Sequence, residues 1–395
     1  MEEKYRVLIV HNYYQIPGGE DTVVANERKL LEDHGHEVSF YSRSNVELKT
    51  MSAGRKLLLP LTTVFNPKTY RDVKRLIREK EIDIVHVHNT LNLISPSVYY
   101  AAFSCGVPVV QTVHNFRLLC PDATFYRDGH ICEDCVEHGL GCALRHSCYR
   151  GSRLQTLACV VSTKIHRMLG TYGKIHYICL TEFNRGKLLQ LKQIRPERVY
   201  VKPNFVETDG EVSPYESRSN QFIYVGRLDK LKGIETLFRA WQILGYDAPK
   251  LLVCGSGPLE DWCRDFLGEN PDCNIRMLGF VSNTEVKGLI ADSRALLLPT
   301  QWYEGFPMTV LEAYSAGTPV IGSNIGNVGD LIEEGVTGYK FPFDSAESLA
   351  AIVESIKKKT SISSGKIRDV FNERYSEQQN IQALEGIYRK AMQED

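Results

Sequence analysis

Two glutamates bracket a helix start in the segment EGFPMTVLE, which runs from Glu304 to Glu312. Gly305 and Pro307 keep the first of them in an irregular loop, and MTVLEAYSAG predicts a short helix that begins at Met308 and ends at its glycine. The first N–H groups of a helix can bind phosphate, and an ionised carboxylate accepts hydrogen bonds from hydroxyls. On spacing alone, two exposed surface glutamates are the favoured explanation. The flanking residues make a sugar phosphate a better fit.

Two cations follow one strand of the second half of the chain. The strand FIYVGRL ends in Arg227, and Lys232 comes five residues later in GRLDKLKG, before the next helix. Each charge-assisted bond to a departing diphosphate contributes about 1.5 to 3 kcal/mol. The alternative is a solvated basic turn. Because the chain has no Asp-x-Asp to hold a divalent ion, we expect phosphate departure without a metal or any other required cofactor.

Glycines and histidines stand at other strand ends. Gly18 and Gly19, in QIPGGEDTVV, precede a helix, so that backbone N–H groups can approach a phosphate; an ordinary turn explains them equally well. His114 ends the strand VPVVQTVHN and could contact sugar hydroxyls or a developing charge. For His86 and His88, which end EIDIVHVHN, a polar strand end satisfied by its neighbours is the favoured explanation.

Short apolar strands alternate with helical segments in both halves of the chain, which predicts an α/β fold of two doubly wound, Rossmann-like domains with parallel sheets. Ligands of such sheets bind outside the carboxyl ends of the strands, so two domains facing each other would form a deep cleft. The predicted boundaries are 1–204 for the N-terminal domain, 205–220 for a polar linker, 221–372 for the C-terminal domain, and 373–395 for a terminal helix. The apolar face of this helix, which we expect to pack back on the first domain, comprises Ile381, Leu384, Tyr388 and Ala391.

Composition narrows the class of protein. A chain of 395 residues with 43% hydrophobic residues can build two large cores, and neither a signal peptide nor an apolar run of 18 residues is present, so we expect a cytoplasmic protein. Residues 1–204 carry 28 Lys and Arg against 20 Asp and Glu, whereas the remainder carries 19 against 28. The first half is therefore the one expected to meet anions. Nucleic acid is not expected as a partner, because no nucleic-acid-binding motif accompanies the positive charge of residues 1–204.

Several stretches together resemble the retaining glycosyltransferases of family 4, which have the GT-B architecture. The most specific is EGFPMTVLEAYSAGTPVIGSNIGNVGDLIEEGVTGYKF, which looks like the Glu-x7-Glu donor site of that family; GRLDKLKGIETLFRAW and VCGSGPLED also match. The resemblance runs nearly end to end. It implies transfer of a sugar from a UDP or GDP sugar to a glycan or lipid-linked acceptor, in bacterial-type surface polysaccharide or glycoconjugate synthesis.

The resemblance also implies a role for each matching position. Glu312 would bind the ribose and Glu304 the donor sugar, while Arg227 and Lys232 would neutralise the diphosphate. The catalytic set is then Glu304, Arg227, Lys232 and His114, and the substrate-binding set is Gly18, Gly19, Phe306, Pro307, Met308, Thr309 and Glu312, with the base near Leu278 to Val281. Since no nucleophile is evident on the far face of the sugar, we expect front-face displacement with retention.

The family pattern does not explain a cysteine-rich insertion at about 117–150. Cys120, Cys132, Cys135, Cys142 and Cys148 fall within 29 residues, and the spacing of Cys132 and Cys135 is typical of metal ligands. Structural zinc on Cys132, Cys135, Cys142 and Cys148, with Cys120 as a substitute, is one interpretation, and plain thiols are the other. We expect the insertion to line the acceptor side of the cleft.

The helix PKTYRDVKRLIREK places Lys68, Arg71, Lys74, Arg75 and Arg78 on one face, in the basic half of the chain. A solvated face is the favoured explanation. Together with Arg55, Lys56 and the apolar LLLPL, this helix could instead rest on an anionic membrane, as a peripheral protein at its inner face would. Two other functions stay open: a nucleotide-sugar 2-epimerase of GT-B type, and a non-catalytic protein that binds sugar nucleotides.

Overall fold

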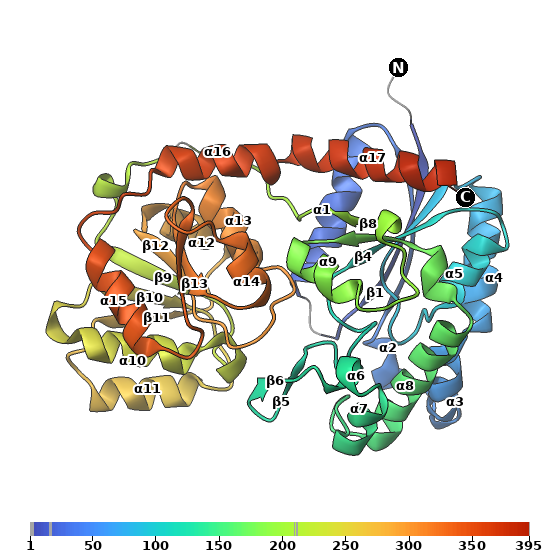
Figure 1. Cartoon of the computed structure of the whole chain (residues 1–395), viewed down its shortest axis with the longest axis horizontal. Coiled ribbons are helices and arrows are strands. Elements are labelled where there is room, and N and C mark those ends of the chain that lie inside the picture. Colours follow the sequence, from blue (N-terminus) through green and yellow to red (C-terminus); the bar gives the residue numbers. More distant parts are fainter. Residues whose placement is uncertain (1–3, 16–17, 209, 211, 395) are drawn as a thin grey trace. The chain divides into compact units, whose positions relative to one another are not determined.

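A computed structural model describes residues 4–15, 18–208, 210 and 212–394 of the chain. The chain forms two compact units (Figure 1): unit 1 comprises Met1–Pro203 and Asn380–Asp395, and unit 2 comprises Asn204–Gln379. Unit 1 thus takes its residues from both sides of unit 2 in the sequence. No helix in the described ranges is long and apolar enough to cross a bilayer.

Unit 1 is built on a six-stranded parallel sheet in the order β2-β1-β3-β4-β7-β8. Its central strands are almost continuously buried, as expected for strands covered by helices on both faces. The strands are β1 (Arg6–Tyr13), β2 (Glu37–Ser44), β3 (Ile84–Asn89), β4 (Val109–Val113), β7 (His176–Cys179) and β8 (Val199–Val201). The helices are α1 (Gly19–Asp33), α2 (Glu47–Thr50), α3 (Ala53–Val64), α4 (Pro67–Glu79), α5 (Ser97–Phe103), α8 (Arg153–Met168), α9 (Glu182–Leu188) and α17 (Glu377–Glu394).

Unit 2 repeats this plan with the strand order β11-β10-β9-β12-β13-β14, again all parallel. Its strands are β9 (Gln221–Val225), β10 (Lys250–Cys254), β11 (Ile275–Gly279), β12 (Ala295–Leu298), β13 (Val320–Ser323) and β14 (Gly338–Phe341). Its helices are α10 (Ile234–Leu244), α11 (Glu260–Glu269), α12 (Asn283–Asp292), α13 (Met308–Ser315), α14 (Gly326–Leu331), α15 (Ala346–Ile356) and α16 (Ser364–Arg374).

The core of unit 2 lies on both faces of its sheet, because side chains alternate along a strand. In β9, Phe222 and Tyr224 belong to a cluster with residues of α10, α11 and α15. Ile223, between them, belongs to a second cluster with residues of α12, α13, α14 and α16. Helices therefore cover the sheet on each side, and the exposed ends of its strands are left for ligands.

The predicted α/β fold of GT-B type, with two parallel doubly wound sheets, is confirmed. The helix predicted from Met308 is α13, and Gly317 follows it with a positive φ of 64°, which a glycine adopts without strain. The cysteine-rich insertion contains a short antiparallel pair of strands and two short helices: β5 (Tyr126–Arg127), β6 (His130–Ile131), α6 (Asp134–Glu137) and α7 (Gly141–His146).

The segment 205–220, expected to be a linker, packs within unit 2; residues 209 and 211 lie outside the described residues. The Tyr215 side chain is buried, and its hydroxyl donates to Ile356 O at 2.6 Å. The guanidinium of Arg218 donates to carbonyls of Ala316 and Gly317. Together with the buried side chains of Phe205 and Val206, this ring and this arginine anchor the segment on unit 2.

The terminal helix, expected from residue 373, is interrupted: α16 ends at Arg374, and α17 begins at Glu377. From Asn380 onwards α17 belongs to unit 1, and the four predicted apolar positions Ile381, Leu384, Tyr388 and Ala391 are all buried. The hydroxyl of Tyr388 lies 2.7 Å from Nδ1 of His86 in β3. This helix therefore contributes to the core of unit 1.

Candidate functional site

In unit 2, two loops meet at the carboxyl ends of β9 and β12, which are neighbours in the sheet. The loop after β9 carries Arg227 and Lys232, and the loop after β12 carries Glu304. Leu231 O in the first loop accepts hydrogen bonds from Gln301 N (2.8 Å) and Thr300 Oγ1 (3.2 Å) in the second. The sheet order therefore brings together residues that are 72 positions apart in the sequence.

Lys232 and Glu304 form an ion pair across these loops. Lys232 Nζ lies 2.7 Å from Oε1 and 2.8 Å from Oε2 of Glu304, and Thr300 Oγ1 donates to Oε1 at 3.0 Å. The Glu304 side chain is only 9% exposed, whereas that of Lys232 is 30% exposed. A buried carboxylate needs such partners, and the lysine that supplies the charge can still reach solvent or a ligand.

The backbone around this pair is fixed on both sides. Asn327 Nδ2, in α14, donates to the carbonyls of Glu304 and Gly305 and so holds the loop after β12. Gly233, next to Lys232, has φ +70°, and a Cβ there would lie 1.7 Å from Pro299 O. Only glycine fits this close approach of the two loops.

Arg227 is not part of the same ion pair. Its guanidinium pairs with Asp229, and its side chain is 64% exposed. Asp229 also caps the turn that leads to Lys232, because its Oδ1 accepts from Lys232 N at 3.0 Å. The two cations expected at one diphosphate thus have separate carboxylate partners, Asp229 and Glu304.

The other predicted donor residues surround the start of α13. Pro307 is the N-cap of this helix, Met308 and Thr309 begin it, and Glu312 lies one turn further in, half-buried. Phe306 and Met308 pack against the apolar cluster beneath the helix, and so do Leu278 and Val281 at the end of β11. The helix N-terminus is thereby held on the core, with its first N–H groups directed outward from the helix.

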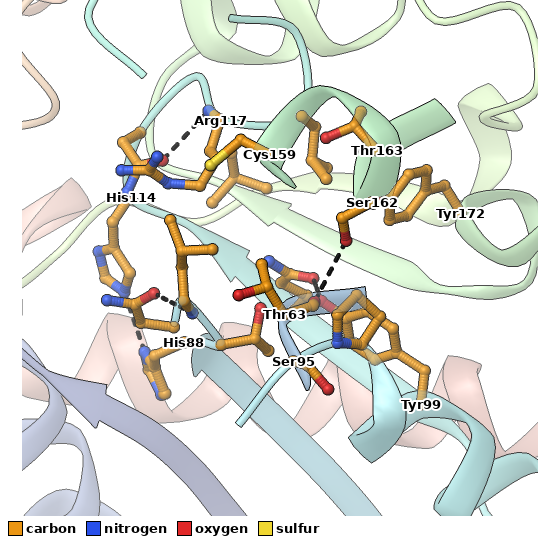
Figure 2. A pocket seen from close by; sticks show the side chains of 18 of the residues that line it. Thr63, His88, Ser95, Tyr99, His114, Arg117, Cys159, Ser162, Thr163 and Tyr172 are labelled. Carbon is orange, nitrogen blue, oxygen red and sulfur yellow. Dashed lines mark hydrogen bonds between the residues drawn. The ribbon is translucent and has the colours of Figure 1, made fainter. Parts of the chain in front are cut away.

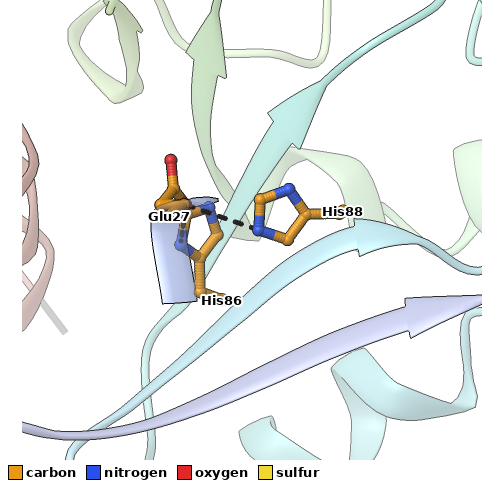
Figure 3. Close-up of side chains that lie close together, drawn as sticks. All are labelled: Glu27, His86 and His88. Carbon is orange, nitrogen blue, oxygen red and sulfur yellow. Dashed lines mark ion pairs between the residues drawn. The ribbon is translucent and has the colours of Figure 1, made fainter. Parts of the chain in front are cut away.

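In unit 1, a chain of polar contacts leads from the core to His114, which follows β4. His114 Nε2 lies 2.9 Å from His88 Nδ1, with the rings stacked at 5.2 Å (Figure 2). His88 Nε2 in turn lies 3.4 Å from Glu27 Oε1 (Figure 3). Both histidines line a small cavity of about 70 Å³, together with Asn115 and Arg117.

Glu27 is the negatively charged group in this series of polar contacts. Burial opposes its ionisation, but Lys202, His86 and His88 outweigh burial and hold the pKa of Glu27 well below its usual value. Lys202 Nζ lies 2.9 Å from Glu27 Oε2. An anionic Glu27 favours a proton on His88 Nε2, which leaves His88 Nδ1 to accept from His114 Nε2–H. His114 then presents Nδ1 as an acceptor, and burial together with His88 lowers its pKa, so the ring is neutral at pH 7.

Glu27, His86 and His88 are the three residues of the described ranges whose ligand atoms lie within 4.8 Å of one another, as a metal site requires. However, each already has another partner. Lys202 Nζ donates to the Glu27 carboxylate and to Asn380 Oδ1. The hydroxyls of Tyr388 and Thr112 lie 2.7 and 2.8 Å from Nδ1 and Nε2 of His86. Because the buried ammonium of Lys202 already pairs with the carboxylate of Glu27, we interpret the three residues as part of an internal ion-pair network.

Gly18 and Gly19 stand at the start of α1, Gly18 as the N-cap and Gly19 as the first residue of the helix. A Cβ at either glycine would meet nothing within 4 Å, so the backbone there is open to a ligand. The Gly18 amide, however, donates to Asp21 Oδ2 at 3.0 Å. Burial and Asp21 raise the pKa of the neighbouring Glu20 to about 8, although Tyr14 donates to it. A protonated Glu20 removes one of the two negative charges that would oppose an anion here.

The five cysteines of the insertion are free thiols. Cys135 packs in a small apolar cluster with Leu140, Ala143 and Val160, against which Cys142 and Cys148 also lie. Burial, followed by the nearby Cys120, raises the pKa of Cys135 to about 12. In the part of the chain that the structure describes, no three of these thiols bring their sulfur atoms within 4.8 Å. The thiols contribute to packing, and zinc stays a prediction for metal analysis of the purified protein.

Comparison with known families identifies the class. The chain matches the family described as Glycosyltransferase Family 4 over residues 17–134, and the family described as Glycosyl transferases group 1 over residues 206–376. The two matches together span more than two thirds of the chain. The protein belongs to the glycosyltransferases that combine these two domains in a GT-B fold.

Individual relatives agree with this class. The chain is 27% identical to an uncharacterized glycosyltransferase of Methanocaldococcus jannaschii, over 66% of this chain and 75% of that one. It is 22% identical to the phosphatidyl-myo-inositol mannosyltransferase of Mycolicibacterium smegmatis, over 89% and 84%. Among solved structures, the lipopolysaccharide outer core galactosyltransferase WaaB has a TM-score of 0.68 at 16% identity, with 98% and 99% covered. The Anabaena protein HepE, in complex with UDP-glucose, has a TM-score of 0.63 at 17% identity, with 97% and 99% covered.

Several residues that shape the site were not expected. Asp229 could have been found, because an aspartate before a helical turn is a typical N-cap. Thr300 and Asn327 offer no such signal, since their partners are far away in the sequence. The same is true of Glu27, which appears in the sequence as one more polar residue of α1 but lies at the centre of the buried network of unit 1.

Proposed function

We propose that the protein is a retaining, metal-independent hexosyltransferase that moves a sugar from a nucleotide diphosphate sugar, with UDP as the first candidate, to a glycan or lipid-linked acceptor. The observation that carries this proposal is the Lys232–Glu304 pair at the strand ends of unit 2, beside the N-terminus of α13. Glu304 offers a carboxylate for sugar hydroxyls, and the lysine offers a mobile charge for phosphate. A synthetic role in surface polysaccharide or glycoconjugate assembly, on the cytoplasmic side of a membrane, fits this chemistry.

On this proposal, Lys232 and Arg227 bind the diphosphate and compensate the charge that develops on it. The bond between the anomeric carbon and the diphosphate oxygen breaks while the acceptor oxygen attacks the same face of the sugar. The acceptor proton passes to the departing phosphate oxygen, so no protein base is needed. Glu304 holds a hydroxyl of the sugar, Glu312 the ribose, and the amides of Met308 and Thr309 the phosphate.

The residues of unit 1 are proposed to act on the sugar and the acceptor. His114, neutral and presenting Nδ1 as an acceptor, suits a hydrogen bond from a sugar hydroxyl. The relatives named above support the choice of donor and acceptor only as analogies: one is solved with UDP-glucose, and another is named a phosphatidyl-myo-inositol mannosyltransferase.

The first test is a thermal-shift panel of UDP, GDP and ADP sugars. A ligand at one hundred times its Kd stabilises a protein by about 2.7 kcal/mol, so the correct donor stands out before any acceptor is known. We expect one nucleotide class to raise the Tm and its sugar to be transferred. The NMR spectrum of the product should show the anomeric configuration of the donor, and turnover should persist in EDTA. Inversion, or complete loss of turnover in EDTA, would contradict the retaining or metal-independent part of the proposal.

The same reactions distinguish the two alternatives. An epimerase would convert the donor sugar without any acceptor, and a non-catalytic binding protein would show the thermal shift without conversion.

A further inference from the structure

Most residues of helix α3 in unit 1 are exposed. Thr63 is its one buried residue. Of its four leucines, Leu57, Leu58 and Leu61 are 82%, 51% and 68% exposed, and Leu59 is half-buried. A helix with this composition is expected to bury its leucines against something, and isolated exposed leucines would need no such explanation.

Helix α8 packs beside α3 and extends the apolar surface. Its residues Leu154, Leu157 and Val161 have helical spacing and are all exposed. Of the fifteen large apolar side chains that are exposed among the described residues, nine belong to these two helices or to their C-caps: Leu57, Leu58, Leu61, Phe65, Leu154, Leu157, Val161, Met168 and Leu169. Such a concentration marks an interaction surface.

The charges on these helices identify the partner. Neither α3 nor α8 contains an acidic residue, and Arg55, Lys56, Arg153 and Lys164 are exposed on them. Exposed leucines surrounded by lysine and arginine fit the boundary between acyl chains and anionic head groups. The core of a protein interface, in contrast, is depleted of lysine. An anionic lipid bilayer is therefore the occupant that this surface suits.

Helix α4, which the sequence suggested could rest on a membrane together with Arg55, Lys56 and LLLPL, has no apolar face available for it. Val73 and Ile77 are buried, and α4 packs against α5. Lys68 pairs with Asp72 on the same helix. Contact with a membrane would therefore depend on the leucines of α3, whereas α4 can offer only exposed cations.

A groove between α3 and α8 leads from this surface toward His114. It is a cavity of about 320 Å³, within the range of ligand sites, and Leu59, Pro60, Leu154 and Ala158 provide apolar walls. Lys56 and Arg150 also line it, and both are exposed. Thr63 and Cys159 line both this groove and the cavity that contains His88 and His114, and Figure 2 shows them around the latter.

We propose that α3 and α8 dock on an anionic lipid bilayer, and that the acceptor is a phosphate-bearing lipid whose apolar chain enters the groove between them. The second part rests on the proposed transferase function, because it names the acceptor of that reaction. Lys56 and Arg150 would bind the lipid phosphate, and the acceptor hydroxyl would reach the cavity of His114.

Membrane docking is tested by co-sedimentation of the full chain with vesicles of phosphatidylcholine alone, or with one third phosphatidylglycerol. We expect binding to the anionic vesicles, and a loss of at least tenfold in the partition coefficient for Leu57→Glu combined with Leu61→Glu. The matched control is Ile243→Glu, on an exposed position of α10 in unit 2, which should bind like the unchanged protein. Equal partitioning into both vesicle types, or undiminished binding of the double variant, would overturn the proposal.

The groove is tested with Ala158→Trp, which fills it, and with Ala158→Leu should the larger residue prevent folding. With a polyprenyl-diphosphate-linked sugar in anionic vesicles as the acceptor, we expect transfer to fall at least tenfold while vesicle binding and the donor thermal shift persist. Full activity of a folded variant, or equal use of the free sugar as acceptor, would refute a lipid acceptor. The absence of any donor thermal shift would instead refute the transferase function and leave the vesicle result standing.

Discussion

The ion pair between Lys232 and Glu304 joins the two loops of the proposed donor site. We expect Lys232→Ala and Glu304→Ala each to lower kcat/KM about 100- to 1000-fold, because a preorganised charge or hydrogen-bonding group contributes that much to transition-state stabilisation. The measurement is transfer at saturating acceptor with the donor identified by thermal shift.

Lys230 provides a control on the same turn, since it is an exposed lysine two residues before Lys232. Lys230→Ala should retain most of the activity. Circular dichroism and Tm separate loss of function from loss of fold. Normal turnover in a folded Lys232→Ala or Glu304→Ala protein would invalidate the assigned donor site.

Glu27 and Lys202 form a second pair, but this one is almost completely buried, at 1% and 2% side-chain exposure. Glu27→Gln leaves the ammonium of Lys202 without its anionic partner, and the loss of one member of a buried pair costs about 3 to 5 kcal/mol. We expect a correspondingly lower free energy of unfolding in urea. Adding Lys202→Met removes the unpaired charge and should restore at least half of the lost stability. If the double variant were as unstable as the single one, the charge would not be the cause.

The residues of the proposed donor site have local signals in the sequence. Arg227 and Lys232 follow a clear strand, and Glu304 and Glu312 stand around a helix start. The ion pairs have no such signal. Lys232 and Glu304 are separated by 72 positions, and Lys202 and Glu27 by 175, and nothing in the spacing along one strand or helix indicates which distant side chain will neutralise which. The sequence thus indicated two cations at one diphosphate, whereas the structure pairs them with two different carboxylates.

Among the secondary-structure elements, the turn from β9 into α10 depends on Gly233. An alanine there would need φ +70° and would place its Cβ 1.7 Å from Pro299 O. We expect Gly233→Ala to destabilise unit 2 by about 2 to 3 kcal/mol and to reduce transfer, because Lys232 moves with the turn. Gly268, inside α11, is the control: a Cβ there meets nothing within 4 Å. Gly268→Ala should raise stability by up to about 1 kcal/mol. Equal effects of the two substitutions on Tm would refute this explanation.

The alternation of strands and helices was predictable for most elements, since buried parallel strands are short apolar runs. β7 has a weaker sequence signal, because HYIC is only four residues long and carries a histidine at its start. The periodicity of α4 correctly indicated one apolar face, but a periodic pattern cannot tell whether that face meets α5 or a membrane. For α3, only the structure shows that three of its four leucines remain exposed.

At the scale of the whole chain, the two units differ in how they respond to pH. All eleven histidines lie between residues 11 and 176, within unit 1, and unit 2 contains none. Burial lowers the pKa of His86 to about 3 and that of His11 to about 4, and it also lowers the pKa values of His114 and His166. Unfolded histidines have pKa values near 6.5, so below that pH the unfolded unit binds protons that the folded unit does not.

It follows that unit 1 loses stability as the pH falls from about 6.5 toward 4, by up to about 1.4 kcal/mol per pH unit for each such histidine, whereas unit 2 has no histidine to respond. The three tryptophans, Trp241, Trp262 and Trp302, all belong to unit 2. Tryptophan fluorescence therefore reports unit 2, while circular dichroism reports both units. We expect the dichroism transition to precede the fluorescence transition at pH 5 and the two to lie closer together at pH 7.5. In His86→Gln, which cannot titrate, the separation at pH 5 should shrink; transitions that coincide at both pH values would show that the buried histidines do not govern acid stability.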